Sequence, residues 1–220
     1  GMGMVMNNSF ALGKIAILQN LGRQTNTLRV HSSRTLGYLQ GAGATFRLAR
    51  SMRLTAFASY TPMDATLNKD GDAQTIVTTG YHRTQTEMDK KHNLHAMKTG
   101  GQLRYDANGL HLGLNALYAH LDRRLTPSKT QMYNMYKPEG ANFMNASIDY
   151  GYARRHLAIN GETATDGNGH IATINTVSYA MNNGLSLMAL QRYYSYQYAS
   201  LDAQSYSDGG RVQNESGVTT

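Results

Sequence analysis

The densest group of side chains able to bind a metal lies in the stretch YHRTQTEMDKKHNLH. It contains His82, His92 and His95, with Glu87 and Asp89 among them. A spacing of three between His92 and His95 suits one face of a helix, whereas a strand would put these two rings on opposite faces. We therefore interpret the stretch as a loop of mixed charge, and the sequence predicts no metal and no cofactor.

The sequence supports neither an ion-binding loop nor a nucleophile site. The stretch TLNKDGDAQTIV resembles a calcium loop at Asn68 and Asp70, but Thr66 occupies the first ligand position and Val77 stands where the bidentate glutamate is expected. A solvated polar loop is the better interpretation. No G-x-S-x-G nucleophile elbow occurs in the chain, and we expect a protein that is not an enzyme.

Four arginines form the remaining candidate site, because each lies within or beside a segment in which apolar and polar side chains alternate. Successive side chains of a strand point to opposite faces, so these arginines are expected on the polar face, opposite neighbours such as Phe46 and Tyr105. There they can contact an anion or a polyanion, or pair with acids such as Asp149 and Glu162, and the sequence leaves both interpretations open. The candidate anion contacts are Arg47, Arg53, Arg104 and Arg192.

The element that must position these arginines is clearest in the stretch RYDANGLHLGLNALY. Asn108-Gly109 is the dipeptide that most favours a two-residue hairpin turn, because both central positions of that turn need positive φ. After the turn, leucines such as Leu112 and Leu114 alternate with polar or small residues, so one face of the hairpin is apolar and the other is polar. The apolar face needs a partner, which is either a protein core or lipid.

The same alternation recurs along the chain and predicts an antiparallel up-and-down meander of about eight strands. Residues 61–93 form one large excursion with a possible strand of its own at 74–82, and residues 1–37 are an unassigned lead-in. Short turns and long loops alternate, so one end of the sheet should carry the short turns and the other end the long loops. The strands are expected at 38–49, 53–60, 95–106, 110–121, 142–152, 156–164, 171–181 and 185–200.

The composition agrees with this all-β fold. The 220 residues include 22 Gly and 15 Tyr but no Trp and no Cys, a balance typical of strands and tight turns. Without cysteine there is no disulfide framework and no cysteine-based zinc site. The net charge of +7 attracts phosphate, lipopolysaccharide, nucleic acid or acidic glycans without choosing among them. We interpret residues 1–220 as a single domain.

Strand length and the tyrosines favour an outer-membrane β-barrel, or part of one. No segment approaches the roughly 18 consecutive apolar residues of a spanning helix, whereas a barrel strand needs about 9 to 11 residues and is apolar only at every second position. Tyrosines gather where strands meet long loops, as in an aromatic girdle at lipid headgroups, although Tyr is also simply a good strand residue. The candidate girdle residues are Tyr60, Tyr118, Tyr193, Tyr194, Tyr196 and Tyr198.

Three long segments carry a likeness to a known family: FASYTPMDATLNKDG, GETATDGNGHIATINTVSY and LSLMALQRYYSYQYASLDAQSYSDGGRVQNESGV. They resemble the barrel region of Bacteroidota outer-membrane proteins that are named after a helix-hairpin-helix domain, and the likeness covers most of the chain. The resemblance implies an outer-membrane location. The helix-hairpin-helix module itself is absent from this sequence, so DNA binding is carried over to none of its residues.

Both ends of the chain lead us to expect a fragment. The start, GMGMVMNNSF, lacks the basic region and apolar core of a signal peptide, so an exported protein would be present here in a mature or truncated form. The family-like pattern would continue after Val218, whereas the chain stops at Thr220 without the terminal aromatic residue typical of outer-membrane barrels. A barrel that is closed in the parent protein could then be open here.

The sequence thus predicts a non-enzymatic outer-membrane β-barrel with a basic polar face, acting as a pore, a channel or a surface scaffold. One alternative is a soluble β-barrel or sandwich that binds an anionic ligand or a glycan. Another, implied by the family resemblance alone, is an accessory component of DNA uptake. The expected partners are outer-membrane lipid and anionic small molecules or polyanions, with nucleic-acid binding and the oligomeric state left open.

Overall fold

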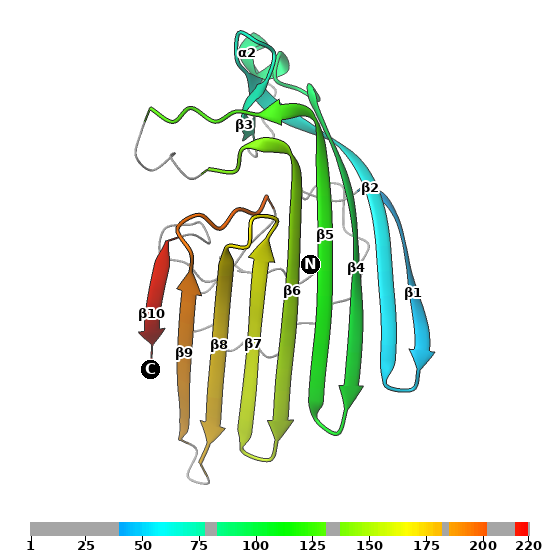
Figure 1. The fold of residues 1–220 in the computed structure, drawn as a ribbon, viewed down its shortest axis with the longest axis vertical. Coiled ribbons are helices and arrows are strands. Elements are labelled where there is room, and N and C mark those ends of the chain that lie inside the picture. The colour runs from blue at the N-terminus through cyan, green and yellow to red at the C-terminus, as the bar shows by residue number, and fades with distance from the viewer. Residues whose placement is uncertain (1–39, 78–82, 131–136, 182–184, 202–213, 220) are drawn as a thin grey trace.

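The computed structural model describes residues 40–77, 83–130, 137–181, 185–201 and 214–219. Most of them belong to one curved sheet (Figure 1). The predicted all-β class and antiparallel meander are confirmed, and the sheet has ten strands where we expected about eight. The lead-in at 1–37 lies outside the described residues.

The strands follow one another across the sheet in chain order, except for β3. Each of the others pairs antiparallel with the next, and β2 pairs directly with β4. β3 pairs with the end of β2 and meets β5 in parallel where Ala73 faces Leu125. The elements are β1 Gly41–Ala49, β2 Met52–Leu67, β3 Ala73–Val77, α2 Gln85–Met88, β4 Leu94–Ala107, β5 Leu110–Leu125, β6 Gly140–Arg154, β7 Leu157–Asp166, β8 Ile171–Ala180, β9 Ser186–Tyr194 and β10 Glu215–Thr219.

The excursion predicted after Tyr60 is smaller than expected, because β2 continues to Leu67. The second half of β2 finds partners in β4 and β3. A proline inside a strand is tolerated where one side of that strand is an edge, and Pro62 lies beyond Ser59, the last residue of β2 that pairs with β1. The strand expected at 74–82 is observed as β3, while residues 78–82 lie outside the described part of the chain.

The C-terminal boundary predictions also change. β9 ends at Tyr194 instead of residue 200, and a further strand, β10, lies beyond the last strand that we expected. Five residues of low hydrophobicity form a strand there because β9 offers them an unpaired edge, with Ser216 opposite Tyr193 and Val218 opposite Gln191.

The hairpin turns and the longer connections lie at opposite ends of the sheet, as predicted. At Asn108 and Gly109 the φ angles are 50° and 80°, which a type I′ turn requires. The opposite end, called the loop end below, carries β3, α2 and the described loop residues 126–130, 137–139 and 195–201 (Figure 1). One connection departs from the pattern: the loop end also holds a short turn at 167–170, between β7 and β8.

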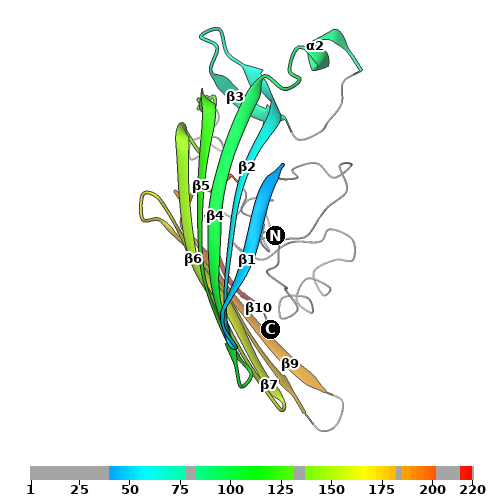
Figure 2. The ribbon, with the colours of Figure 1, turned by 90° about the vertical axis from the view of Figure 1, so that its right-hand side faces the viewer.

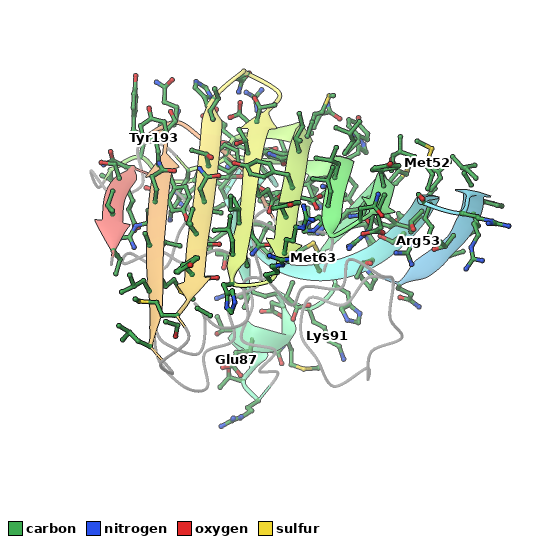
Figure 3. The ribbon with its side chains drawn as sticks, turned by 90° about the horizontal axis from the view of Figure 1, so that it is seen from below. Met52, Arg53, Met63, Glu87, Lys91 and Tyr193 are labelled. Atoms are coloured by element: carbon green, nitrogen blue, oxygen red, sulfur yellow. The ribbon has the colours of Figure 1, made fainter. Side chains whose placement is uncertain are left out.

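The two faces of the sheet differ in chemistry. Side chains alternate between them, and Figure 3 shows Met52 and Arg53 on opposite sides. The concave face (Figure 2) carries mostly small and polar side chains, many of them buried. The convex face carries exposed large apolar side chains, which are Phe46, Leu48, Tyr60, Met97, Tyr105, Leu110, Leu112, Leu114, Tyr118, Met144, Ile148, Ile171, Val177, Tyr179, Leu187, Tyr193 and Val218.

Near the loop end this arrangement reverses, and apolar side chains pack on the concave side. Here β3 and α2 project beyond the end of the sheet, and α2 lies toward its concave side (Figure 2). None of the helices in the described residues is long and apolar enough to cross a membrane. We call the packed group the loop-end core, and it consists of Ala65, Ala73, Leu94, Ala96, Ala119, Leu121, Leu125 and Phe143.

Candidate functional site on the concave face

A single row of mostly charged side chains crosses the concave face. Cross-strand register pairs Arg47 with Arg53, and Arg53 with Arg104. Alternation along each strand puts all four predicted arginines on this face, and the register between strands puts them on one row. From β1 to β9 the row reads Arg47, Arg53, Arg104, Gly113, Asp149, Glu162, Ile174 and Arg192.

Two of the arginines share one carboxylate. Arg53 Nη2 donates to Asp106 Oδ2 at 2.8 Å, and Arg104 Nε donates to Asp106 Oδ1 and Oδ2 at 2.9 and 2.8 Å. One carboxylate neutralises one of the two guanidinium groups, and Arg47 adds a further exposed positive charge on β1. This end of the row is therefore basic and suited to attract an anion, and the anion contact itself stays a prediction.

Arg192 is held differently. Its side chain is only 9% exposed, and its Nε lies 3.5 Å from Glu215 Oε2. A buried guanidinium has to be compensated by acids of the protein itself. Its burial therefore favours a structural role for Arg192 over contact with a ligand.

An amide network, which the sequence analysis did not identify, joins β4, β5 and β6 next to the charged row. Gln102 Nε2 donates to Asn115 Oδ1 at 2.8 Å, and Asn115 Nδ2 donates to Asp149 Oδ2 at 2.8 Å and to Ser147 Oγ at 3.1 Å. Gly113 makes room for this arrangement, since a Cβ atom there would collide with the Asp149 carboxylate. Alternation along β5 was the only sequence signal for it.

The concave face thus buries groups that a protein interior normally excludes. Lys98, Asp149 and Glu162 are between 2% and 7% exposed. Burial of a charge costs several kcal/mol unless it is paired and hydrogen-bonded. The surrounding polar network is therefore a structural requirement, and it makes this face a polar surface rather than an apolar core.

The tyrosines proposed for an aromatic girdle divide into two groups. Tyr60, Tyr118 and Tyr193 belong to the convex face and Tyr196 follows β9, and all four are between 41% and 60% exposed. Figure 3 shows Tyr193 on the same side of the sheet as Met52. These four are accessible to a surrounding medium, as a girdle requires.

Tyr194 and Tyr198 are buried, at 2% and 3% exposure, so the prediction that they belong to an outward girdle is wrong. Tyr194 follows Tyr193 in the strand and therefore points to the concave side. Both buried rings pack in a second small cluster with Ala164 and Ala172. Burial, followed by the charge of nearby carboxylates, raises the pKa of the Tyr198 hydroxyl above its usual range.

Side chains of the histidine-rich stretch make structural contacts. A short helix, α2, replaces part of the expected loop, and the Glu87 carboxylate accepts the backbone N–H of Thr84 in a capping box. The His95 ring lies 3.0 Å from Asp122 Oδ2. His82 lies outside the described residues. Within the described ranges no three potential metal ligands come together.

Hydrogen bonds between a side chain and the backbone hold the calcium-like loop in shape. Asn68 Oδ1 accepts the N–H groups of Asp70 and Asp72, both at 2.9 Å. Arg123 Nη1 donates to the Gly71 carbonyl at 2.9 Å and ties the loop to β5. The Asn68 side-chain oxygen is therefore already used as a turn acceptor.

A cleft of about 390 Å³ lies at the loop end. It opens between residues 137–139 and the turn 167–170, and its lining mixes apolar side chains such as Phe143 with charged ones such as Lys137 and Asp166. It lies away from the charged row, and no ligand class follows from its mixed lining.

Comparison of the chain with protein-family models, with curated proteins and with solved structures finds no match in any of the three. The family resemblance of the sequence therefore stays a prediction, and a function has to be argued from the geometry.

Proposed function

We propose that this chain forms part of the wall of an outer-membrane β-barrel, with lipid against the convex face and a polar interior on the concave face. The observation that carries the proposal is the inverted polarity of the sheet. Leu112 and Leu114 are 43% and 52% exposed, whereas Asn115 and Asp149 are 4% and 7% exposed. Water favours the opposite distribution, and lipid outside the sheet accounts for the one observed.

The borders of the convex apolar surface support the same proposal. On β5 it extends from Leu110 to Tyr118, about 9 residues, which is the length that a tilted strand uses to cross the hydrocarbon layer. Beyond it the outward side chains are polar, and Tyr118 Oη donates to Asn142 Oδ1 at 2.8 Å. Tyrosines border this apolar band on both sides, with Tyr60, Tyr118 and Tyr193 toward the loop end and Tyr105, Tyr152 and Tyr179 toward the hairpin turns.

The concave face suggests what such a barrel does. Its charged row is basic on β1, β2 and β4 and acidic on β6 and β7, so a solute beside it meets a charge gradient along the wall. Charged linings of this kind select among ions in pores. We propose a non-enzymatic pore, channel or surface scaffold, with anionic small molecules or polyanions meeting the arginine end.

Fewer observations support the alternative functions. A soluble β-barrel or sandwich would bury the face that carries Leu112 and Leu114 and expose the face that carries Asn115 and Asp149, the reverse of their exposure in this structure. A role in DNA uptake rests on the family resemblance alone, and no contact on the concave face argues for it.

The test places single cysteines on the two faces of β5 in the full chain, which contains no cysteine of its own. Leu112→Cys, Leu114→Cys and, as the opposite-face control, Asn115→Cys are each labelled with an environment-sensitive fluorophore in phosphatidylcholine vesicles. Brominated phosphatidylcholine then serves as the quencher. We expect strong quenching at the two leucine positions and little at Asn115.

Each outcome decides between the leading proposal and its main alternative. Quenching confined to the leucine positions supports a membrane barrel. A water-soluble monomer without lipid quenching at any of the three positions overturns the proposal and favours the soluble ligand-binding protein.

A further inference from the structure

The convex face carries one polar network within its apolar band. Asn175 on β8 and Gln191 on β9 are cross-strand partners, and Asn175 Nδ2 donates to Gln191 Oε1 at 2.7 Å. Asn175 Nδ2 also lies 3.3 Å from Thr173 Oγ1, and Asn175 Oδ1 accepts the hydroxyl of Tyr150 on β6. We call these four residues the outer amide network.

The network lies between apolar residues of the band. On β8 and β9 it is followed toward the hairpin turns by Val177 and Leu187, and toward the loop end by Ile171 and Tyr193, all of them exposed. It is therefore not part of either polar end of the strands. A primary amide at this depth needs a hydrogen-bonding partner.

Several residues beside the network are small. Gly161 on β7 stands between Tyr150 and Asn175 in the same row, and a Cβ atom at Gly161 would lie 2.6 Å from Tyr150 Cζ. Ala189 and Ser216, on the same face, are also small. Small side chains allow the backbones of neighbouring membrane segments to approach closely.

The network leaves hydrogen-bonding capacity at its outer end. Within the described residues, Gln191 Oε1 accepts from Asn175, and no acceptor lies opposite the two hydrogens of Gln191 Nε2. In hydrocarbon an unsatisfied polar group costs several kcal/mol. A partner that supplies an amide oxygen removes this cost, and Gln191 itself carries both a donor and an acceptor.

We propose that the outer amide network is the contact site for a second copy of this chain in the membrane. Across a twofold axis, Gln191 Nε2 of each copy donates to the amide oxygen of the other, which makes the surface self-complementary. The occupant is a second copy rather than lipid because phospholipid tails offer no acceptor at this depth. This inference rests on the proposed membrane location of the convex face.

The experiment combines lipid quenching with a measurement of oligomeric state on the full chain in phosphatidylcholine vesicles. Ala189→Cys places a fluorophore beside the network, and Leu114→Cys reports the convex face away from it. Gln191→Leu removes the amide. Thr99→Val, which removes a polar group from the same face on β4, is the matched control. Crosslinking at several protein-to-lipid ratios measures the dimer fraction.

We expect a dimer in which position 189 is shielded from brominated lipid and position 114 is quenched. Gln191→Leu should weaken dimerisation at least about tenfold and expose position 189, because it removes both reciprocal amide hydrogen bonds between the two copies. Thr99→Val should leave the dimer unchanged.

Other outcomes overturn the inference in distinguishable ways. Equal quenching at positions 189 and 114 with a monomer overturns the dimer but leaves the membrane proposal intact. Shielding at 189 without self-association points to a different partner and also overturns it. Absence of quenching at both positions overturns the membrane proposal itself, and the dimer site with it.

Discussion

The apolar band and the loop-end core lie on the same strands but have opposite polarity. On β5, Leu112 and Leu114 stand exposed on the convex face, whereas Leu121 and Leu125 are buried on the concave side. The register between β4 and β5 runs without a break from Leu110 to Leu121. The reversal therefore comes from the sequence. The apolar residues shift from one set of alternate positions to the other, while the backbone pairing continues unchanged.

The proposed membrane location accounts for this difference, because it puts lipid outside one part of each strand and water outside the other. Where water surrounds the sheet, apolar side chains turn inward and polar residues such as His120 and Asp122 turn outward. Where the outer side chains are large and apolar, a lipid exterior accounts for the reversed choice. The following predictions test the two regions against each other.

The largest effect is expected in the loop-end core. Leu121→Ala should lower the free energy of unfolding by about 2–5 kcal/mol, because it leaves a cavity in packed protein. The matched change Leu114→Ala removes the same atoms from the convex face and should cost less, because mobile lipid fills the gap. Circular dichroism in urea measures both losses in vesicles, since the chain has no Trp. Equal losses would place both leucines in packed protein.

A charge on the convex face should have the next largest effect. Leu114→Arg is expected to cost about 2–4 kcal/mol in lipid, the penalty for an arginine near the bilayer midplane. His120→Arg, on the same strand and face but beyond the band, should change the stability by less than about 0.5 kcal/mol. The same vesicle unfolding assay compares them. If Leu114→Arg proves as mild as His120→Arg, water surrounds both positions.

A smaller effect is expected in the amide network of the concave face. Asn115→Leu leaves Gln102 Nε2 without its acceptor and removes a donor from Asp149, which should cost about 1–3 kcal/mol. The double variant with Gln102→Leu should recover part of this loss, because it removes the orphaned amide. Unfolding measurements on the two single variants and the double variant give the coupling energy, and strict additivity would contradict the network.

The smallest effect is expected at the exposed ion pairs of the loop end. Glu139 lies 2.6 Å from Lys129 Nζ and 3.6 Å from Arg124 Nη2. All three side chains are more than one third exposed, so Glu139→Gln should cost less than about 0.5 kcal/mol.

The pH dependence of this contribution has a definite sign. The hydrogen bond from Lys129, followed by its charge, lowers the pKa of the Glu139 carboxyl in the folded protein. Any stabilisation is then complete above the unfolded pKa and is lost as the pH falls through the lower folded pKa. Unfolding curves at falling pH, with Glu139→Gln as the reference, measure it, and a difference that grows on acidification would contradict this sign.

Alternation and turn chemistry made much of the sheet predictable. The Asn108-Gly109 turn fixed the β4–β5 hairpin, and the parity of Arg53 and Arg104 relative to their apolar neighbours put them on one face. The same parity could have placed Asp106 on this face, because Asp106 lies two residues after Arg104 on the same strand.

Other features needed the register between strands. The charged row depends on which residue of each strand faces which residue of the next, and no local pattern gives this. Tyr194 and Tyr198 were misassigned because a cluster of tyrosines in the sequence was treated as one surface, although neighbouring residues of a strand face opposite ways. β10 was missed because its five residues, most of them polar or small, form a strand only where β9 pairs with them.

The order of the strands has a consequence for how such a wall is made. Apart from β3, each strand pairs with its nearest neighbours in the chain, so most contacts close short loops at low entropic cost, which favours rapid formation of one hairpin after another. A hairpin gained or lost at an edge of the sheet disturbs only the pairing at that edge. The circumference of the wall can therefore change in steps of two strands, by duplication or deletion of a hairpin, without redesign of the rest.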